Sequence, residues 1–155
     1  MENLEHIVLA QPLFAGLDPE VGALITGCAR NHRFEAGTCL FREREPADEF
    51  FLVREGEVSL EIDAPGRRTL VLNTIGEGQV VGVSWLLPPY RWISDARART
   101  VVRALGFDAQ CLRTKCDEDP RTDYEMMKRF VPLVANRLQS AYLQLLDVYR
   151  APERR

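Results

Sequence analysis

The sequence predicts a mainly β protein with flanking helices, built as a sandwich or jelly roll. Three observations support this fold class. Short alternating segments broken by Gly and Pro fill about residues 35–108, a short helical zone precedes them, and one long helical pattern follows. The length of 155 residues is typical of a single domain. We therefore expect residues 1–155 to form one unit, with about 109–150 as its C-terminal helices.

The first zone, about residues 1–34, is expected to be helical. Asp18 is suited to cap a helix because its carboxylate accepts backbone N–H bonds, and Pro19 fits the first helical position because it has no N–H to lose. The apolar residues that follow at helical spacing are Val21, Leu24, Ile25 and Cys28.

The second zone, about residues 35–108, is expected to form strands. In the segment EVSLEIDA, apolar residues alternate with polar ones, which is typical of a half-buried strand. The apolar set is Val58, Leu60 and Ile62, and the polar set is Glu57, Ser59, Glu61 and Asp63. The turn DAPGRR leads into a returning strand, TLVLNTI, and GEGQ turns the chain again. The segment DARARTVVRALGFD is predicted to run on as a strand.

The third zone is expected to hold two helices. The segment AQCLRTKC predicts a short helix, and Pro120 fits the first turn of a much longer one. Pro132 lies inside the long helix and is expected to bend it, because proline lacks a backbone donor that the helix uses. An apolar seam repeats in alternating steps of four and three, as in a coiled coil, at Met127, Val131, Val134, Leu138, Ala141, Leu145 and Val148.

This seam favours a homodimer. A small β domain cannot cover so long an apolar face by itself, so we predict that these residues form a dimer interface. The alternative is that the long helix packs only on its own domain.

Composition restricts the classes of function. The net charge is −3, from 20 Lys and Arg against 23 Asp and Glu, which is no electrostatic footprint for nucleic acid. The N-terminal segment MENLEHIVLA lacks the pattern of a signal peptide, and the apolar stretches are far shorter than the roughly 20 residues that a membrane span needs. We therefore expect a cytoplasmic protein that does not cross a membrane.

The side chains that could ligate a metal or catalyse a reaction are sparse. No C-x-x-C pair occurs among the four cysteines, and the chain has 2 His, so we expect no zinc or iron–sulfur site. We interpret the cysteines as reduced structural thiols, at Cys28, Cys39, Cys111 and Cys116. Neither a Ser/His/Asp set nor a P-loop is present, so the sequence gives no catalytic residues and predicts a protein that is not an enzyme.

Three segments, taken in order, resemble the cyclic-nucleotide-binding domains of the Crp/Fnr type. PLFAGLDPE resembles the N-terminal helical signature of that family, FREREPADEFFLVREGEVSLEI resembles its core block, and IGEGQVVGVSWLL falls at its glycine turn and phosphate-binding cassette. The heptad helix falls where the family has its dimerising helix. The resemblance covers nearly the whole chain and implies a cyclic-nucleotide-binding-type β jelly roll with N-terminal helices and a long C-terminal dimer helix.

The resemblance also implies a role, that of a non-enzymatic regulatory or sensor domain. In this sequence only RAPERR follows Tyr149. We therefore expect no helix-turn-helix behind the long helix and no DNA binding by this chain alone.

Two departures from the family pattern affect the backbone and the sugar side of the site. The family's turn glycine in the core block is Arg44 here, so we expect that turn to be built differently, because arginine adopts a positive φ less readily. In the cassette, Gly82 matches the family glycine, but Val83 stands where the family has glutamate. Valine cannot accept a hydrogen bond from a ribose hydroxyl, a loss of about 1.5–3 kcal/mol.

Further departures concern the size of the cassette side chains. Trp85 stands near a position where the family has a small residue, and Trp92 and Ile93 follow where it has Ser or Thr and then Ala. Arg91 is the best match to the family's phosphate-binding arginine, with a spacing shifted by about one residue.

The cassette residues retain what an anion needs. Gly82 permits close backbone approach, Ser84 can cap or donate, and Arg91 can make a bidentate contact with phosphate. The resemblance places two further polar residues near the base, Ser140 and Tyr142. No cofactor is certain, and the ligand that we expect is nucleotide-like or another small anion rather than ordinary cyclic AMP.

Two hypotheses stay open on the sequence. In the first, a ligand binds the cassette and the helix, at Gly82, Val83, Ser84, Trp85, Arg91, Trp92, Ser140 and Tyr142. In the second, Trp85, Tyr90 and Trp92 fill the pocket, Arg91 pairs with a carboxylate such as Asp95, and the domain binds a partner protein or joins a larger complex without a small-molecule ligand. The two differ in whether the space beside Gly82 and Arg91 is open or filled.

Overall fold

The computed structural model of the protein describes residues 3–66 and 68–150. The helices that precede the sheets are α1 (Leu4–Leu9), the 3-10 helix η1 (Pro12–Phe14) and α2 (Pro19–Thr26). The predicted cap of α2 is confirmed, because the Asp18 carboxylate accepts a hydrogen bond of 2.8 Å from the backbone N–H of Glu20. The expectation of helix up to residue 34 is wrong. Ala29–Phe34 is strand β1, which pairs with another strand along its whole length.

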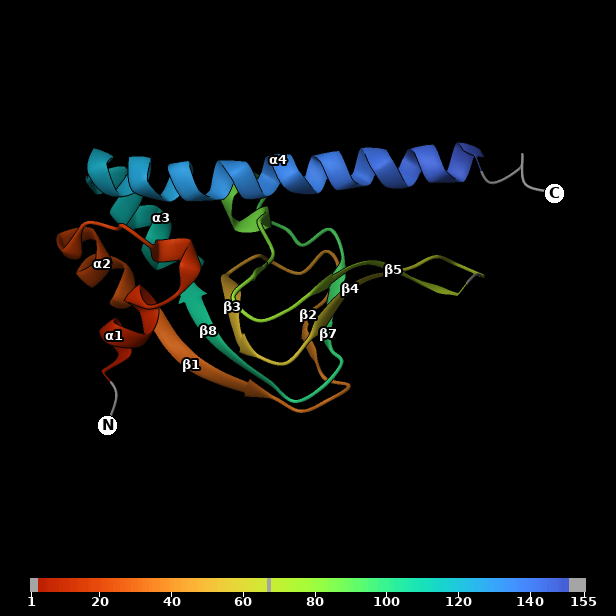
Figure 1. The fold of residues 1–155 in the computed structure, drawn as a ribbon, viewed down its shortest axis with the longest axis horizontal. Coiled ribbons are helices and arrows are strands. Elements are labelled where there is room, and N and C mark those ends of the chain that lie inside the picture. The colour runs from red at the N-terminus through yellow and green to blue at the C-terminus, as the bar shows by residue number, and fades with distance from the viewer. Residues whose placement is uncertain (1–2, 67, 151–155) are drawn as a thin grey trace.

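The predicted jelly roll is confirmed by two antiparallel sheets of four strands each, in the orders β1-β8-β3-β6 and β2-β7-β4-β5 (Figure 1). The remaining strands are β2 (Cys39–Phe41), β3 (Glu49–Glu55), β4 (Val58–Asp63), β5 (Thr69–Ile75), β6 (Val80–Val81), β7 (Asp95–Ala98) and β8 (Val102–Asp108). The segment DARARTVVRALGFD is thus two strands instead of one. A turn at Arg99–Val101 divides it. The Arg99 backbone N–H stabilises this turn by donating a hydrogen bond of 2.8 Å to the Glu57 carbonyl.

Strand β4 buries side chains from both of its faces. Val58 of the apolar set is buried as expected, but Ser59 and Glu61 of the polar set are also buried, while Leu60 and Ile62 are only half-buried. The Glu61 carboxylate accepts hydrogen bonds from the Ser59 hydroxyl and from Arg97 Nε, the latter at 3.2 Å. A buried carboxylate with such partners avoids the penalty of an unpaired charge. The alternation therefore predicted the strand but not the burial of Ser59 and Glu61.

The C-terminal helices are α3 (Ala109–Glu118) and α4 (Pro120–Arg150), as the sequence predicts. Helix α4 lies along one side of the two sheets (Figure 1) and continues through Pro132 without a break, so the expected bend is not seen. Within residues 3–66 and 68–150, no helix is long and apolar enough to cross a membrane. The last residues of the RAPERR tail, 151–155, lie outside the described part of the chain.

An aromatic cluster joins α4 to the β1-β8-β3-β6 sheet. The ring of Phe50 lies 4.7 Å from that of Trp85 and 4.9 Å from that of Phe107, and Phe130 of α4 meets Trp85 edge-on at 5.2 Å. Aromatic pairs of this kind contribute about 0.5–1.5 kcal/mol each beyond their burial. This packing fixes the first third of α4.

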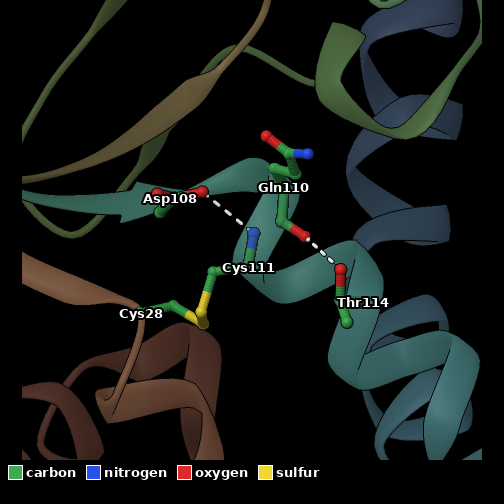
Figure 2. The surroundings of a disulfide bond; sticks show 5 residues. All are labelled: Cys28, Asp108, Gln110, Cys111 and Thr114. Carbon is green, nitrogen blue, oxygen red and sulfur yellow. Dashed lines mark hydrogen bonds between the residues drawn. A yellow bond between two sulfur atoms is a disulfide. The ribbon is translucent and has the colours of Figure 1, made fainter.

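A disulfide between Cys28 and Cys111 ties the segment after α2 to the first turn of α3. Figure 2 shows the two side chains meeting between these elements, with the Asp108 carboxylate accepting a hydrogen bond of 2.9 Å from the Cys111 backbone N–H. The prediction of reduced thiols is wrong for this pair, whose partners are 83 residues apart in the sequence. Cys39 and Cys116 are free, and burial raises the pKa of the Cys116 thiol to about 11.

Candidate functional site

The cassette loop, residues 82–92, connects β6 to β7. It begins at Gly82, whose φ of +92° is in the left-handed region, and continues into the short 3-10 helix η2 (Ser84–Leu86). It then passes the cis peptide bond between Pro88 and Pro89 and ends where Arg91 bridges to Pro46. The loop therefore consists of a glycine in the left-handed region, one short helix and a segment that returns to the turn before β3.

Trp92 fills the space beside Gly82. Its ring is buried and stacked on Phe41, with ring centroids 3.7 Å apart. A Cβ atom added to Gly82 would lie 2.3 Å from the Trp92 ring, so the indole covers the backbone at this glycine. Backbone hydrogen bonds hold Trp92 in place, because its N–H donates to Glu45 at 3.0 Å and its carbonyl accepts from Arg44 at 2.8 Å.

Arg91 is exposed and binds the chain's own backbone. Its Nη1 donates to the Arg44 carbonyl at 3.1 Å. The expected pairing of Arg91 with Asp95 is wrong, since the Asp95 carboxylate accepts a hydrogen bond of 2.8 Å from the Glu43 backbone N–H. Arg91 thus supports the turn before β3 and has no carboxylate partner among the described residues.

Arg44 adopts the conformation of the glycine that it replaces. Its φ is +74°, so the expectation of a differently built turn is wrong. A non-glycine residue in this region costs about 1–3 kcal/mol and needs support from its surroundings. Hydrogen bonds at both its N–H and its carbonyl, to Trp92 and from Arg91, supply that support.

The other cassette residues lie apart from the filled space. Trp85 is buried in the aromatic cluster under α4, so it does not close the pocket at Gly82. Val83 and Ser84 are half-buried at the start of η2, and no side-chain bond caps that helix. Tyr90 lies under the guanidinium of Arg113, 4.2 Å from the ring centroid. Of the three aromatic residues expected to fill the pocket, Trp92 supplies the three atoms nearest to a Cβ built on Gly82.

The two α4 residues expected near a base do not converge. Ser140 lines a cavity beside β5, whereas the Tyr142 side chain is 60% exposed. Residues two positions apart on a helix are about 200° apart around its axis, so they cannot face one pocket of the same chain. The structure therefore separates the predicted ligand residues into the filled cassette, the cavity at Ser140 and the solvent-facing Tyr142.

The predicted seam of α4 is largely uncovered in this single chain. Met127 and Val134 are half-buried and Ala141 is exposed. The larger exposed side chains of the seam are Val131, Leu138, Leu145 and Val148, each more than half exposed. An apolar surface of this length is unusual for a protein that has no partner.

Three residues of the site were missed by the sequence reasoning. Phe41 supports the Trp92 ring, Arg113 donates to the Trp85 carbonyl at 2.7 Å, and Arg137 lines the cavity at Ser140. Phe41 lies within the quoted core block and Arg137 lies three residues before Ser140, so their positions could have drawn attention to them. Arg113 has no such signal. Among the described residues, no group of three or more His, Cys, Asp or Glu side chains could hold a metal ion.

Comparisons with known proteins agree with this architecture. The CRP-like cAMP-activated global transcriptional regulator of Mycobacterium tuberculosis is 26% identical over 145 residues, which cover 94% of this chain and 63% of that protein. The chain thus spans less than two thirds of the length of this curated relative.

Solved structures share the fold. A candidate cyclic nucleotide-binding protein of Geobacter metallireducens GS-15 superposes with a TM-score of 0.78 at 27% identity, covering 89% of this chain and 99% of that one. The catabolite activator protein of Thermus thermophilus gives a TM-score of 0.69 at 24% identity, over 89% of this chain and 63% of its own, and shows likeness of fold alone. The family model described as cyclic nucleotide-binding domain matches residues 31–119. With more than half of its length matched, this chain belongs to the cyclic nucleotide-binding domain family.

Proposed function

We propose that this chain is a single, non-enzymatic regulatory domain whose nucleotide cassette is closed by its own Trp92, and that it acts as a homodimer through α4. The observation that carries the proposal is the buried Trp92 ring, stacked on Phe41 and lying against Gly82. A ligand phosphate would need the backbone at this glycine. The domain therefore acts through contacts of its surface with another chain, and it binds no cyclic AMP at the cassette.

The energetic argument combines a missing contact with a filled space. Val83 lacks the carboxylate that would bind a ribose hydroxyl, which weakens binding roughly 10- to 150-fold. Moving the Trp92 ring into water would expose about 200 Å² of aromatic surface, at a cost of roughly 5 kcal/mol. Together these effects support binding of cyclic AMP that is very weak or absent.

The homodimer follows from the uncovered side of α4. Its exposed apolar side chains recur in steps of three and four, which is the pattern that two helices need to pack along a common seam. A partner protein that offers a similar helix is the alternative occupant. A cytoplasmic location stays a prediction from the sequence.

Calorimetry with cyclic AMP and cyclic GMP tests the cassette. We expect no binding by the wild type at ligand concentrations up to about 1 mM. The Trp92→Ala variant should open the space, and Trp92→Ala with Val83→Glu should restore both halves of a nucleotide site and bind more tightly than either single variant. Ile93→Ala, which changes an exposed neighbour, serves as the control. A micromolar Kd for the wild type that Arg91→Ala abolishes would overturn the proposal.

A further inference from the structure

A second cavity, which we name the helix pocket, lies between α4, η1 and the β5–β6 corner. Its volume is about 510 Å³, within the range of roughly 300–1,000 Å³ that is usual for small-molecule sites. Leu13 and Leu133 contribute apolar walls, and the polar groups come from Asn73, Asn136, Arg137 and Ser140. The helix pocket shares no lining residue with the cassette loop, so the two are separate features of the molecule.

Arg137 gives the helix pocket a positive charge. The side chain is half-buried, and one guanidinium nitrogen donates to the Val80 carbonyl. No ion pair within residues 3–66 and 68–150 includes Arg137. Burial accordingly lowers the pKa of the Arg137 guanidinium from its ordinary value, and no carboxylate opposes that effect. A cation removed from water without a counterion is unfavourable, so the pocket is complementary to an anion.

Polar groups around Arg137 can orient such an anion. Asn136 and Ser140 are four residues apart on α4, so they lie one turn apart on the same flank. The Asn73 side-chain carbonyl accepts a hydrogen bond of 2.9 Å from the Thr74 N–H, which leaves its NH₂ group free to donate. The guanidinium can bind a planar or tetrahedral oxyanion through two N–H groups.

We propose that the helix pocket binds a small organic anion whose carboxylate or phosphate group pairs with Arg137 and whose apolar or aromatic part lies between Leu13 and Leu133. This proposal does not depend on the state of the cassette. Around the axis of α4, Arg137 lies about 100° from Leu138 of the exposed seam, and Asn136 and Ser140 lie about 160° from it. A bound anion would therefore connect α4 to β5 without covering the proposed dimer surface.

The proposal has a mechanical consequence. Beyond the helix pocket, α4 contacts the domain through Gln144, whose amide donates to the Leu72 carbonyl at 3.1 Å. An anion held between α4 and β5 would strengthen this weakly attached half of the helix. The pocket thus offers a route by which a ligand could change how α4 is presented.

Two simple anions, phenyl phosphate and benzoate, test the pocket by NMR titration of the wild-type protein. Probes of this size should bind with a Kd in the millimolar range, because ligands with so few heavy atoms gain little binding free energy. We expect the signals of Asn73, Asn136 and Ser140 to shift, and the uncharged benzyl alcohol to shift them much less. Comparison of the two anions shows whether phosphate or carboxylate is preferred.

Variants assign the binding to Arg137. Arg137→Gln should raise the Kd at least about tenfold, and Arg137→Lys less, because lysine keeps the charge but loses the bidentate geometry. Ser140→Leu, on an exposed helix position, should block the pocket without affecting folding. Gln139→Leu is the matched control on the opposite flank and should bind like the wild type.

Three results would overturn the proposal. The first is unchanged binding in both Arg137→Gln and Ser140→Leu. The second is a set of shifts confined to the cassette loop, which would assign the anion to that loop. The third is no saturable shift with either anion up to about 10 mM. Should Arg137→Gln fail to fold, the pair Ser140→Leu and Gln139→Leu still decides the question.

Discussion

Arg91 of the cassette loop and Arg137 of the helix pocket each donate a hydrogen bond to a backbone carbonyl, but their environments are opposite. Arg91 is exposed, so water solvates its charge, and it supports the strained residue Arg44. Arg137 is half-buried beside an open cavity and has no carboxylate partner among the described residues. Arg91 was identified as a candidate ligand residue by its place in the family pattern. Arg137 was identified by its burial and by the absence of a carboxylate partner among the described residues.

The two arginines also differ in whether the space beside them is filled or open. The Trp92 ring fills the space beside Gly82 in the cassette loop, whereas the helix pocket is an open cavity of about 510 Å³. A cassette pattern can therefore be recognised in a sequence although the space beside its glycine is filled, while the helix pocket is lined by segments far apart in the chain. The following predictions test this difference, beginning with the largest expected effect.

The substitution Leu138→Asp tests whether the helix pocket belongs to each single chain or needs a second copy. A carboxylate placed in an apolar interface should weaken dimerisation by several kcal/mol. Sedimentation should therefore show a dimer for the wild type and a monomer for the variant, while phenyl phosphate still binds with the wild-type Kd. A wild type that is monomeric at micromolar concentration would contradict the homodimer, and loss of binding in the variant would place the pocket between copies.

The substitution Gly82→Ala tests how tightly Trp92 fills the cassette. The new Cβ would need a left-handed backbone at φ +92° and would lie 2.3 Å from the indole. We expect the free energy of unfolding in urea to fall by about 3–5 kcal/mol, from backbone strain and overpacking together. Gly37→Ala is the matched control, since its φ is +90° and nothing lies within 4 Å of the added atom. Equal losses in the two variants would show that the space beside Gly82 is not filled.

The disulfide is expected to support the cassette side of the molecule more than the helix pocket. Cys111 lies in the first turn of α3, and Arg113 of the same helix donates to the Trp85 carbonyl and lies over Tyr90 of the cassette loop. Because 83 residues separate the two cysteines, Cys111→Ser or reduction should lower the free energy of unfolding by about 2–4 kcal/mol. Amide exchange should then rise in the cassette loop before it rises at Asn73. With the bond intact, the untreated protein should show the two thiols of Cys39 and Cys116 after unfolding, and a count of four would contradict the bond.

The Cys28–Cys111 disulfide depends on the redox conditions around the protein. In a reducing compartment such as the cytoplasm, which the sequence predicts for this chain, a disulfide between Cys28 and Cys111 would persist only under oxidation. The buried Cys116 thiol, with its raised pKa of about 11, should stay unreactive and gives an internal reference in thiol labelling.

Local chemistry made part of the fold predictable from the sequence. Asp18 followed by Pro19 predicted where α2 begins, and Pro120 predicted where α4 begins, because caps and first turns depend on a few adjacent residues. The family resemblance predicted the jelly roll. The burial of Ser59 and Glu61 on β4 could not be predicted, since Glu61 is satisfied by Arg97, a residue of another strand.

The candidate site was less predictable because its decisive contacts join distant residues. Trp92 is seen to fill the cassette only once Phe41 is placed beneath it, and Arg44 shows its positive φ only in the folded turn. The helix pocket is formed by segments from η1, β5 and α4, so no local pattern signals it. The sequence placed Ser140 near a ligand, but with cassette residues that lie elsewhere.

The smallest expected effect is the change in the free energy of unfolding when Arg91 or Arg137 is replaced by Met, and its sign should differ between the two. In a buffer without phosphate or carboxylate, Arg91→Met should lower the free energy of unfolding by about 1 kcal/mol, because the Arg44 carbonyl loses its donor. Arg137→Met should leave the free energy of unfolding unchanged or raise it by up to about 1 kcal/mol, because it removes a half-buried charge that lacks a counterion. Denaturation in urea compares the stability of the two variants. Arg91→Met, the less stable variant, should bind phenyl phosphate like the wild type, whereas Arg137→Met should bind it more weakly. A loss above about 2 kcal/mol in Arg137→Met would mean that this arginine serves the fold itself, as Arg91 does, and that its charge is not held ready for an anion.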